Sequence, residues 1–360
     1  MLSEHEINVV SEPEFGPIIG QKMVPSIQPD KVTPTQRKVI CTVGPASLKP
    51  RIIRRLDALG VSLFRINLSH TPLQEVRPAI EFLQKHTTVP ICLDSEGAQI
   101  RTGTFATAPT SLRKDSLIRV HRHPVDGDAE KFNFTPSDTL ELLEPGDLIT
   151  IDFHAVVVEV MEIEIDRAVL RVRKAGRVGS NKACNVHRDI ELPAITVKDR
   201  RAIEIGREMG VDHYALSFAN RPEDVREMRE LIGPGATLIS KIESRSGIAH
   251  LEEIARLSDA ILIDRGDLSR QVPVQQIPAQ QKNIIGRVKA IGRPIYVATN
   301  LLESMVHSEV PTLAEINDIY NTLDDGADGL VLASETAVGK FPVQCVSMVM
   351  SVIAEFEGPK

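Results

Sequence analysis

Two apolar runs of this chain, 237-TLISKIES-244 and 260-AILIDRGD-267, each end abruptly in charged residues. The first run ends in Lys241 and Glu243, and the second ends in three charged residues, of which Asp267 is the last. A buried strand gains nothing from a charge at its tip, because an unpaired buried charge costs far more free energy than a few apolar contacts return. Charges at strand ends therefore indicate a metal ion or an anionic ligand. The two runs predict a divalent-metal site beside a lysine, an arrangement suited to phosphate or enolate chemistry.

The same pattern recurs along the rest of the chain. Short Val/Ile/Leu-rich runs alternate with amphipathic segments of helical period from residue 38, and again from about residue 194. Strands that are almost entirely apolar are typical of a parallel sheet covered on both faces. Eight βα units predict an α/β fold, a (β/α)8 TIM barrel, whose active site lies at the C-terminal ends of the strands. The eight runs are KVICTVG, VSLFRINLSH, VPICLDSEG, HYALSF, ATLISKIES, DAILIDRGDL, RPIYVATN and GADGLVLASE.

Polar side chains follow these runs at the strand ends that such a barrel brings to one rim. Simpler structural interpretations exist for some of them. Asn67 and Ser69 could cap a following helix, and Arg65 could form a salt bridge with Asp94. The set comprises Arg65, Asn67 and Ser69 after the second strand, Asp94 after the third, Lys241 and Glu243 after the fifth, Asp267 after the sixth, Thr299 after the seventh and Glu335 after the eighth.

Residues 104–185 interrupt the barrel pattern. Their apolar residues alternate, and Asp-Gly and Pro-Gly pairs mark turns, which predicts a small antiparallel β domain inserted after the third strand. A lid in this place could close over the rim and exclude water. The predicted division is an extended N-terminal arm at 1–36, barrel at 37–103, lid at 104–185 and barrel again at 186–360.

Composition excludes several classes of protein. The net charge of -7 argues against a nucleic-acid-binding or anionic-membrane-binding protein, and no run approaches the roughly 18 apolar residues of a membrane span. No secretory signal is recognisable at the N-terminus. The 4 cysteines are scattered, and Cys41 and Cys92 are expected to be small core residues. A reducing, cytoplasmic location is therefore expected.

The strand-end motifs resemble those of the pyruvate kinase family. The resemblance covers about residues 36–358 and includes the position of the inserted lid. The matching stretches are KVICTVGPAS (38–47), LFRINLSH (63–70), LDSEGAQIRTG (93–103), GSNKACNV (179–186), LISKIESRSGI (238–248), DRGDL (264–268), ATNLLESM (298–305) and SETAVG (334–339).

The resemblance implies phosphoryl transfer between phosphoenolpyruvate and ADP, giving pyruvate and ATP, with Mg²⁺ or Mn²⁺ and usually K⁺. It implies that two carboxylates bind the divalent ion and that a lysine neutralises the transferring phosphoryl group and the enolate. The implied residues are Glu243 and Asp267 for the divalent metal; Lys241, Arg65 (phosphate) and Thr299 (proton delivery) for catalysis; Asn67, Ser69, Asp94 and Ser95 for K⁺; and Arg101 and Lys182 for nucleotide phosphates.

The chain departs from the family motifs mostly on the nucleotide side. Gln99 replaces a glutamate that accompanies K⁺ dependence, Phe153 replaces a lid aspartate, and Val338 replaces a lysine. Asp264 replaces an alanine, which places a carboxylate near an anionic substrate unless it pairs with Arg265 or another cation, or binds a metal. The sequence stops where the family's C-terminal regulatory domain would begin, so we expect a short form in which any homo-oligomer uses barrel surfaces.

Three functions remain open at this level. The first is a pyruvate kinase without the usual allosteric domain. The second is a metal-dependent enzyme that acts on phosphoenolpyruvate, pyruvate or an oxo acid through an enolate, as a lyase, aldolase or decarboxylase, without a nucleotide. The third is a non-catalytic scaffold or regulatory homologue. Intact metal residues count against the third, whereas Phe153, Val338 and Asp264 count against the first.

Overall fold

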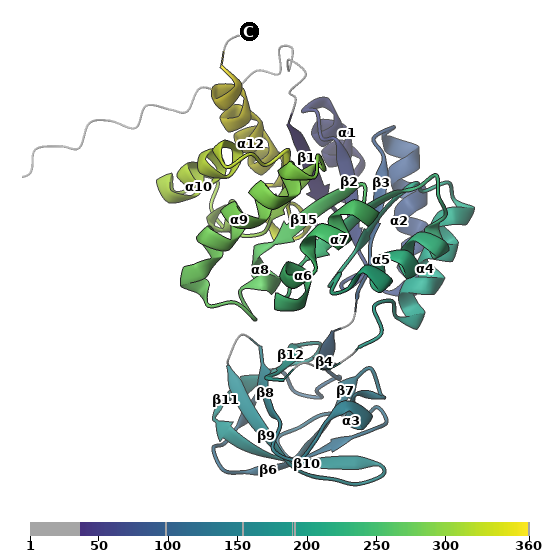
Figure 1. Cartoon of the computed structure of the whole chain (residues 1–360), viewed down its shortest axis with the longest axis vertical. Helices are drawn as coiled ribbons and strands as arrows, with labels where there is room; N and C mark the ends of the chain where they lie inside the picture. Colours follow the sequence, from purple (N-terminus) through teal and green to yellow (C-terminus); the bar gives the residue numbers. More distant parts are fainter. Residues whose placement is uncertain (1–36, 98, 153–154, 189, 191, 359–360) are drawn as a thin grey trace, which may run out of the picture. The chain divides into compact units, whose positions relative to one another are not determined.

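The larger part of the protein is a closed barrel of parallel strands. The computed structural model describes residues 37–97, 99–152, 155–188, 190 and 192–358. The arm expected at 1–36, together with Phe153, lies outside the described residues. Eight strands close in the order β1-β17-β16-β15-β14-β13-β3-β2, which confirms the predicted (β/α)8 barrel (Figure 1). The strands are β1 (Lys38–Thr42), β2 (Leu63–Asn67), β3 (Ile91–Asp94), β13 (His213–Leu216), β14 (Thr237–Ile242), β15 (Ala260–Asp264), β16 (Ile295–Ala298) and β17 (Gly329–Leu332).

Helices cover the outside of this barrel, and both faces of each strand are buried. In β1, Ile40 belongs to the cluster inside the barrel, whereas Val39 and Cys41 belong to the cluster under the helices. Capping boxes at Thr196 and Thr312 begin two of the helices. The elements are α1 (Pro50–Ala58), α2 (Leu73–His86), α4 (Val197–Glu208), α5 (Pro222–Ile232), α6 (Arg245–Ala249), α7 (Leu251–Leu257), α8 (Arg265–Leu268), α9 (Ile277–Ala290), α10 (Leu313–Asp324), α11 (Ser334–Ala337) and α12 (Pro342–Glu357), with short 3₁₀ helices η1 (Val274–Gln276) and η2 (Glu303–Val306).

The inserted segment forms a second, smaller barrel with its own apolar core. Its strands close in the order β10-β6-β7-β4-β12-β8-β9, and β5 and β11 form a separate pair. Most pairs are antiparallel, as predicted for the inserted domain, whereas β6 and β7 pair in parallel. The predicted division at residue 104 falls just after β4. The elements are β4 (Ile100–Thr102), β5 (Thr110–Leu112), β6 (Leu117–His121), β7 (Lys131–Thr135), α3 (Thr139–Leu142), β8 (Leu148–Ile151), β9 (Val156–Ile163), β10 (Arg167–Lys174), β11 (Gly176–Val178) and β12 (Ala183–Val186).

The chain leaves β3 toward the smaller barrel through an anchored turn. The buried Asp199 carboxylate accepts hydrogen bonds from the backbone N–H groups of Glu96 (2.7 Å) and Gly97 (3.2 Å). Burial raises the pKa of Asp199 and these hydrogen bonds oppose that rise. Gly97 has φ +73°, and a Cβ there would lie 2.7 Å from the Cβ of Ser217, so only glycine fits this turn.

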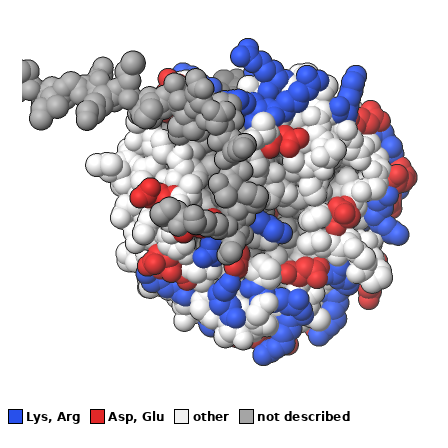
Figure 2. All heavy atoms as spheres, turned by 90° about the horizontal axis from the view of Figure 1, so that it is seen from above, with Lys and Arg blue, Asp and Glu red and all other residues white. Residues whose placement is uncertain are grey.

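The surface carries charges of both signs. On the face shown in Figure 2, Lys and Arg side chains are interspersed with Asp and Glu. Within the described part of the chain, no helix is both long and apolar enough to cross a membrane. All 4 cysteines are free and buried, as the sequence led us to expect for Cys41 and Cys92.

Candidate active site at the barrel rim

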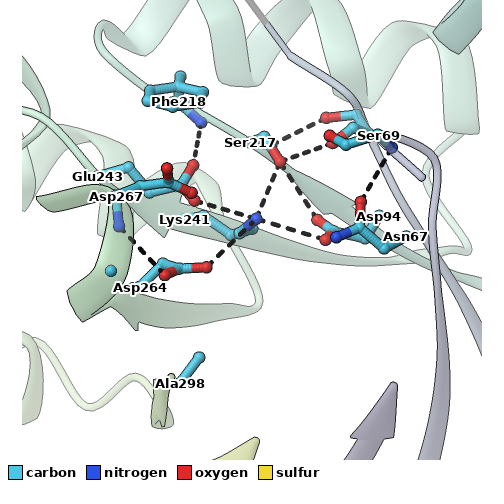
Figure 3. A network of polar contacts seen from close by, with 12 residues as sticks. Asn67, Ser69, Asp94, Ser217, Phe218, Lys241, Glu243, Asp264, Asp267 and Ala298 are labelled. Carbon is cyan, nitrogen blue, oxygen red and sulfur yellow. Dashed lines mark hydrogen bonds and ion pairs between the residues drawn. The ribbon is translucent and has the colours of Figure 1, made fainter. Parts of the chain in front are cut away.

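Lys241 lies at the centre of a buried polar network at the C-terminal ends of the strands (Figure 3). Its side chain is only 5% exposed, and its Nζ lies 3.0 Å from Glu243 Oε1, 3.3 Å from Asp94 Oδ2 and 3.8 Å from Asp264 Oδ2. Burial opposes the positive charge, but these three carboxylates outweigh it and hold the pKa of Lys241 well above its usual range. Lys241 is therefore a fixed cation at neutral pH.

Three carboxylates converge beside this lysine. Glu243, Asp264 and Asp267 each place one oxygen atom within 4.8 Å of the others. Glu243 is fully buried. Its Oε2 accepts a hydrogen bond from the Phe218 backbone N–H (2.6 Å), whereas its Oε1 forms the ion pair with Lys241 (3.0 Å) but accepts no hydrogen bond. Burial and the neighbouring carboxylates raise the pKa of Glu243 and of Asp267. Three clustered carboxylates, one of them with a buried oxygen that accepts no hydrogen bond, fit a hard divalent cation.

Asp264 does not pair with Arg265, which corrects one of the alternatives drawn from the sequence. β15 ends at Asp264 and α8 begins at Arg265, so the two side chains leave the backbone in different directions. The Arg265 guanidinium forms an ion pair with Asp318 (2.9 Å), while Asp264 faces Lys241. The Asp264 carboxylate thus remains within the rim cluster.

Arg265 fixes the backbone of Thr299 instead. Its Nε and Nη2 donate to the Thr299 carbonyl oxygen at 3.1 and 2.7 Å. Thr299 has φ +69°, in the left-handed region that is strained for a β-branched residue. In this conformation its hydroxyl oxygen accepts from the Gly266 N–H (2.8 Å) and lies 3.2 Å from Asp264 Oδ1. This left-handed backbone conformation places the Thr299 hydroxyl at the edge of the carboxylate cluster.

The opposite side of Lys241 is held by the second and third strands. The buried Arg65 pairs with Asp94 (3.2 Å) and donates from Nε to Thr42 Oγ1 (2.8 Å), so the salt bridge considered from the sequence is present. Asn67 is the register partner of Asp94, and its Oδ1 accepts from the Ser69 N–H (2.9 Å). Helix α2 begins after Pro72, so neither Asn67 nor Ser69 caps it.

Arg101 and Lys182 come together in the smaller barrel. Arg101 pairs in register with Ala183, the residue after Lys182. Arg101 donates to the Asn181 carbonyl (3.1 Å), and Lys182 pairs with Asp152 (3.0 Å). Burial lowers the pKa of Arg101, while the Asp267 carboxylate acts in the opposite direction. The backbones of the two residues are therefore close together where β12 begins.

The structure adds residues that the sequence did not single out. Ser217 joins the network by accepting from Lys241 Nζ (3.0 Å) and contacting Asp94 Oδ1 (3.3 Å), and its N–H donates to Ser95 Oγ (2.9 Å). Arg270 pairs with Asp267 (2.9 Å). The only sequence signal for Ser217 was its place at the end of the HYALSF run.

Glu335, which the sequence also placed at the rim, has a structural role. It is buried, and its carboxylate accepts hydrogen bonds from the backbone N–H groups of Leu302 (3.3 Å) and Ala333 (2.8 Å). It therefore stabilises the loops after β16 and β17.

A cavity of about 680 Å³ borders the carboxylate cluster. Asp267 and Phe218 line it from the larger barrel, and Ile100 lines it from the smaller one. Four arginines also line it, Arg188, Arg221, Arg245 and Arg270. A space of this size with a cationic wall can hold a small anionic ligand.

Comparisons with known proteins agree on one family. A family model described as "Pyruvate kinase, barrel domain" matches residues 35–346. The pyruvate kinase of Methylorubrum extorquens is 36% identical over 324 residues, covering 88% of this chain and 68% of that relative. A pyruvate kinase of Agrobacterium vitis is 37% identical over 332 residues (90% and 68%), and that of Thermotoga maritima is 35% identical over 329 residues (89% and 71%).

Proposed function

The chain belongs to the pyruvate kinase family, and we propose that its rim cluster transfers a phosphoryl group between phosphoenolpyruvate and ADP. The observation that carries this assignment is the buried, permanently charged Lys241 among three carboxylates. A fixed cation beside a metal-binding cluster can stabilise the charge that develops on a transferring phosphoryl group. Nothing in the described structure or in the relatives favours the nucleotide-free enzyme or the scaffold.

We assign the divalent ion, Mg²⁺ or Mn²⁺, to Glu243 and Asp267. The carboxylate spacing and the buried Glu243 Oε1, which accepts no hydrogen bond, support this assignment. Bound there, the ion would act as a Lewis acid on substrate oxygens. Two carboxylates leave open coordination positions for those oxygens.

Lys241 and Arg65 are assigned to the phosphoryl group. Both are buried and both contact Asp94, which fixes their positions before substrate arrives. Such preorganisation avoids reorganisation during the reaction. Thr299 is assigned as the group that orients a proton toward the enolate carbon, since its hydroxyl is held in place by a strained backbone.

The remaining roles concern K⁺ and the nucleotide. Oxygen atoms of Asn67, Ser69, Asp94 and Ser95 are assigned to K⁺, because one carboxylate with neutral oxygens suits a monovalent ion. Arg101 and Lys182 are assigned to nucleotide phosphates; in support, Arg101 on β4 pairs in register with Ala183, the first residue of β12, which directly follows Lys182. We further propose that the enzyme is cytoplasmic.

One assay tests the function. Purified protein is given Mg²⁺, K⁺, phosphoenolpyruvate and ADP, and both ATP and pyruvate are followed over time. We expect equal amounts of the two products, and loss of at least about 10²-fold in rate for Lys241→Ala, since one preorganised charge is commonly worth that much. Pyruvate without ATP, or activity that survives Lys241→Ala, would overturn the proposal.

A further inference from the structure

Asp264 is a buried carboxylate that the proposed roles do not use. Its side chain is 7% exposed and lies at the tip of β15 within the cluster formed with Glu243 and Asp267. A buried charge of this kind is costly unless a cation compensates it.

The cations that the structure describes around the cluster do not balance its carboxylates. Arg65 pairs with Asp94 and Arg270 pairs with Asp267. Lys241 then faces both Glu243 at 3.0 Å and Asp264 at 3.8 Å, so one positive charge serves two negative ones. The 3.8 Å contact is too long for a hydrogen bond.

The geometry of the three carboxylates suits one cation. Oxygen ligands of an octahedral Mg²⁺ or Mn²⁺ ion lie roughly 3 Å apart when adjacent and roughly 4 Å apart when opposite, given metal–oxygen distances of about 2.1 Å. The three oxygen atoms here already lie within 4.8 Å of one another. Glu243 is fully buried, and its Oε1 accepts no hydrogen bond although Lys241 Nζ lies 3.0 Å away, so this oxygen atom is still able to bind a cation at the same place.

We propose that Asp264 is a third carboxylate ligand of the divalent-metal site, beside Glu243 and Asp267. The inference rests on the proposed assignment of the metal to the latter two residues. It predicts tighter metal binding than two carboxylates would give, and three rather than four water molecules on the ion before substrate binds.

Mn²⁺ binding without substrate tests this inference. The dissociation constant is measured by calorimetric titration, and water proton relaxation then reports how many water molecules bound Mn²⁺ keeps. For Asp264→Ala we expect at least about tenfold weaker binding and a rise of about one third in the relaxation enhancement per bound ion, as a fourth water enters. Asp264→Asn, which keeps the shape, should give an intermediate affinity, and thermal unfolding shows whether each variant is folded.

Two further variants separate the possible failures. Asp212→Ala changes the net charge equally at an exposed site next to the start of β13, and should leave Mn²⁺ binding unchanged. Glu243→Gln should weaken binding; if it does not, the metal assignment itself is wrong. If Glu243→Gln weakens binding but folded Asp264→Ala binds Mn²⁺ as the parent does, only the third ligand is refuted. Weaker binding with unchanged relaxation would show that Asp264 acts through its charge alone, which also overturns its assignment as a ligand.

Discussion

Replacing Lys241 with methionine should lower the stability of the metal-free protein more than removing a charged side chain from an exposed surface site does. The substitution keeps the length and apolar stem of the side chain but removes the cation at the centre of the rim network. Asp94 would retain its ion pair with Arg65 (3.2 Å). Glu243 and Asp264, which are 0% and 5% exposed, would lose the ammonium group that both contact.

The size of the effect follows from these lost contacts. Removing one partner of a buried ion pair costs about 3–5 kcal/mol, because the other charge remains buried and uncompensated. At about 2–3 °C per kcal/mol for a chain of this size, the melting temperature should fall by about 6–15 °C. Protonation of the carboxylates relieves the cost. The penalty should therefore be fully present at high pH and shrink as pH falls through the raised pKa values of Glu243 and Asp267.

Calorimetric unfolding of parent and Lys241→Met, with and without Mg²⁺, measures this penalty. We expect Mg²⁺ to raise the melting temperature of the variant more than that of the parent, since the ion replaces the missing positive charge. Lys289→Met serves as the control, because Lys289 is 45% exposed and its partner Asp328 also contacts Arg37 (3.7 Å). That variant should lose no more than about 1 kcal/mol. Equal losses in the two variants, or a Lys241→Met penalty that does not change with pH, would refute the reasoning.

Two further outcomes are expected. Arg265→Lys keeps the charge near Asp318 but cannot supply both hydrogen bonds to the Thr299 carbonyl. In urea unfolding this variant should lose about 2–4 kcal/mol of stability, and it should lose most ATP formation while still binding Mn²⁺. Unchanged stability would contradict the role of Arg265. Burial and neighbouring carboxylates raise the pKa of Glu243 and of Asp267, so protons compete with the metal. Mn²⁺ affinity should therefore rise with pH above the ordinary carboxyl range, with proton release visible in titrations across buffers; a flat profile would count against this.

The barrel and its rim could be predicted because they follow from simple periodic rules. Eight apolar runs with intervening helical segments allow few other folds, and parallel closure brings all their C-terminal ends together. This is why Lys241, Glu243 and Asp267 could be grouped although they lie at or just beyond the ends of two different strands. The alternation of apolar residues also predicted a small β domain, but alternation is the same in parallel and antiparallel pairs, so it could not reveal the parallel pairing of β6 with β7.

Other parts of the site depend on directions that a sequence does not specify. Asp264 and Arg265 are adjacent in the chain, which made their pairing plausible, yet the change from strand to helix between them separates the side chains. The hydrogen bond from the Phe218 N–H to Glu243 is donated by the backbone, so the identity of residue 218 gives no sign of it in the sequence. The left-handed φ of Thr299 likewise depends on Arg265, which is distant in the sequence.

The extra carboxylate at residue 264 changes how the rim attracts an anionic substrate. With a divalent ion bound, Glu243, Asp264, Asp267 and Lys241 together carry no net charge, whereas an alanine at 264 would leave one positive charge. At about 5 Å and an effective dielectric near 20, the added carboxylate repels each unit of substrate charge by about 3 kcal/mol. Four arginines line the adjoining cavity and can offset that repulsion: Arg188, Arg221, Arg245 and Arg270. Attraction for the substrate would then come from the cavity wall as much as from the metal. Partly exposed charges are screened by salt more strongly than buried ones. Higher ionic strength should therefore weaken substrate binding more than it weakens Mn²⁺ binding.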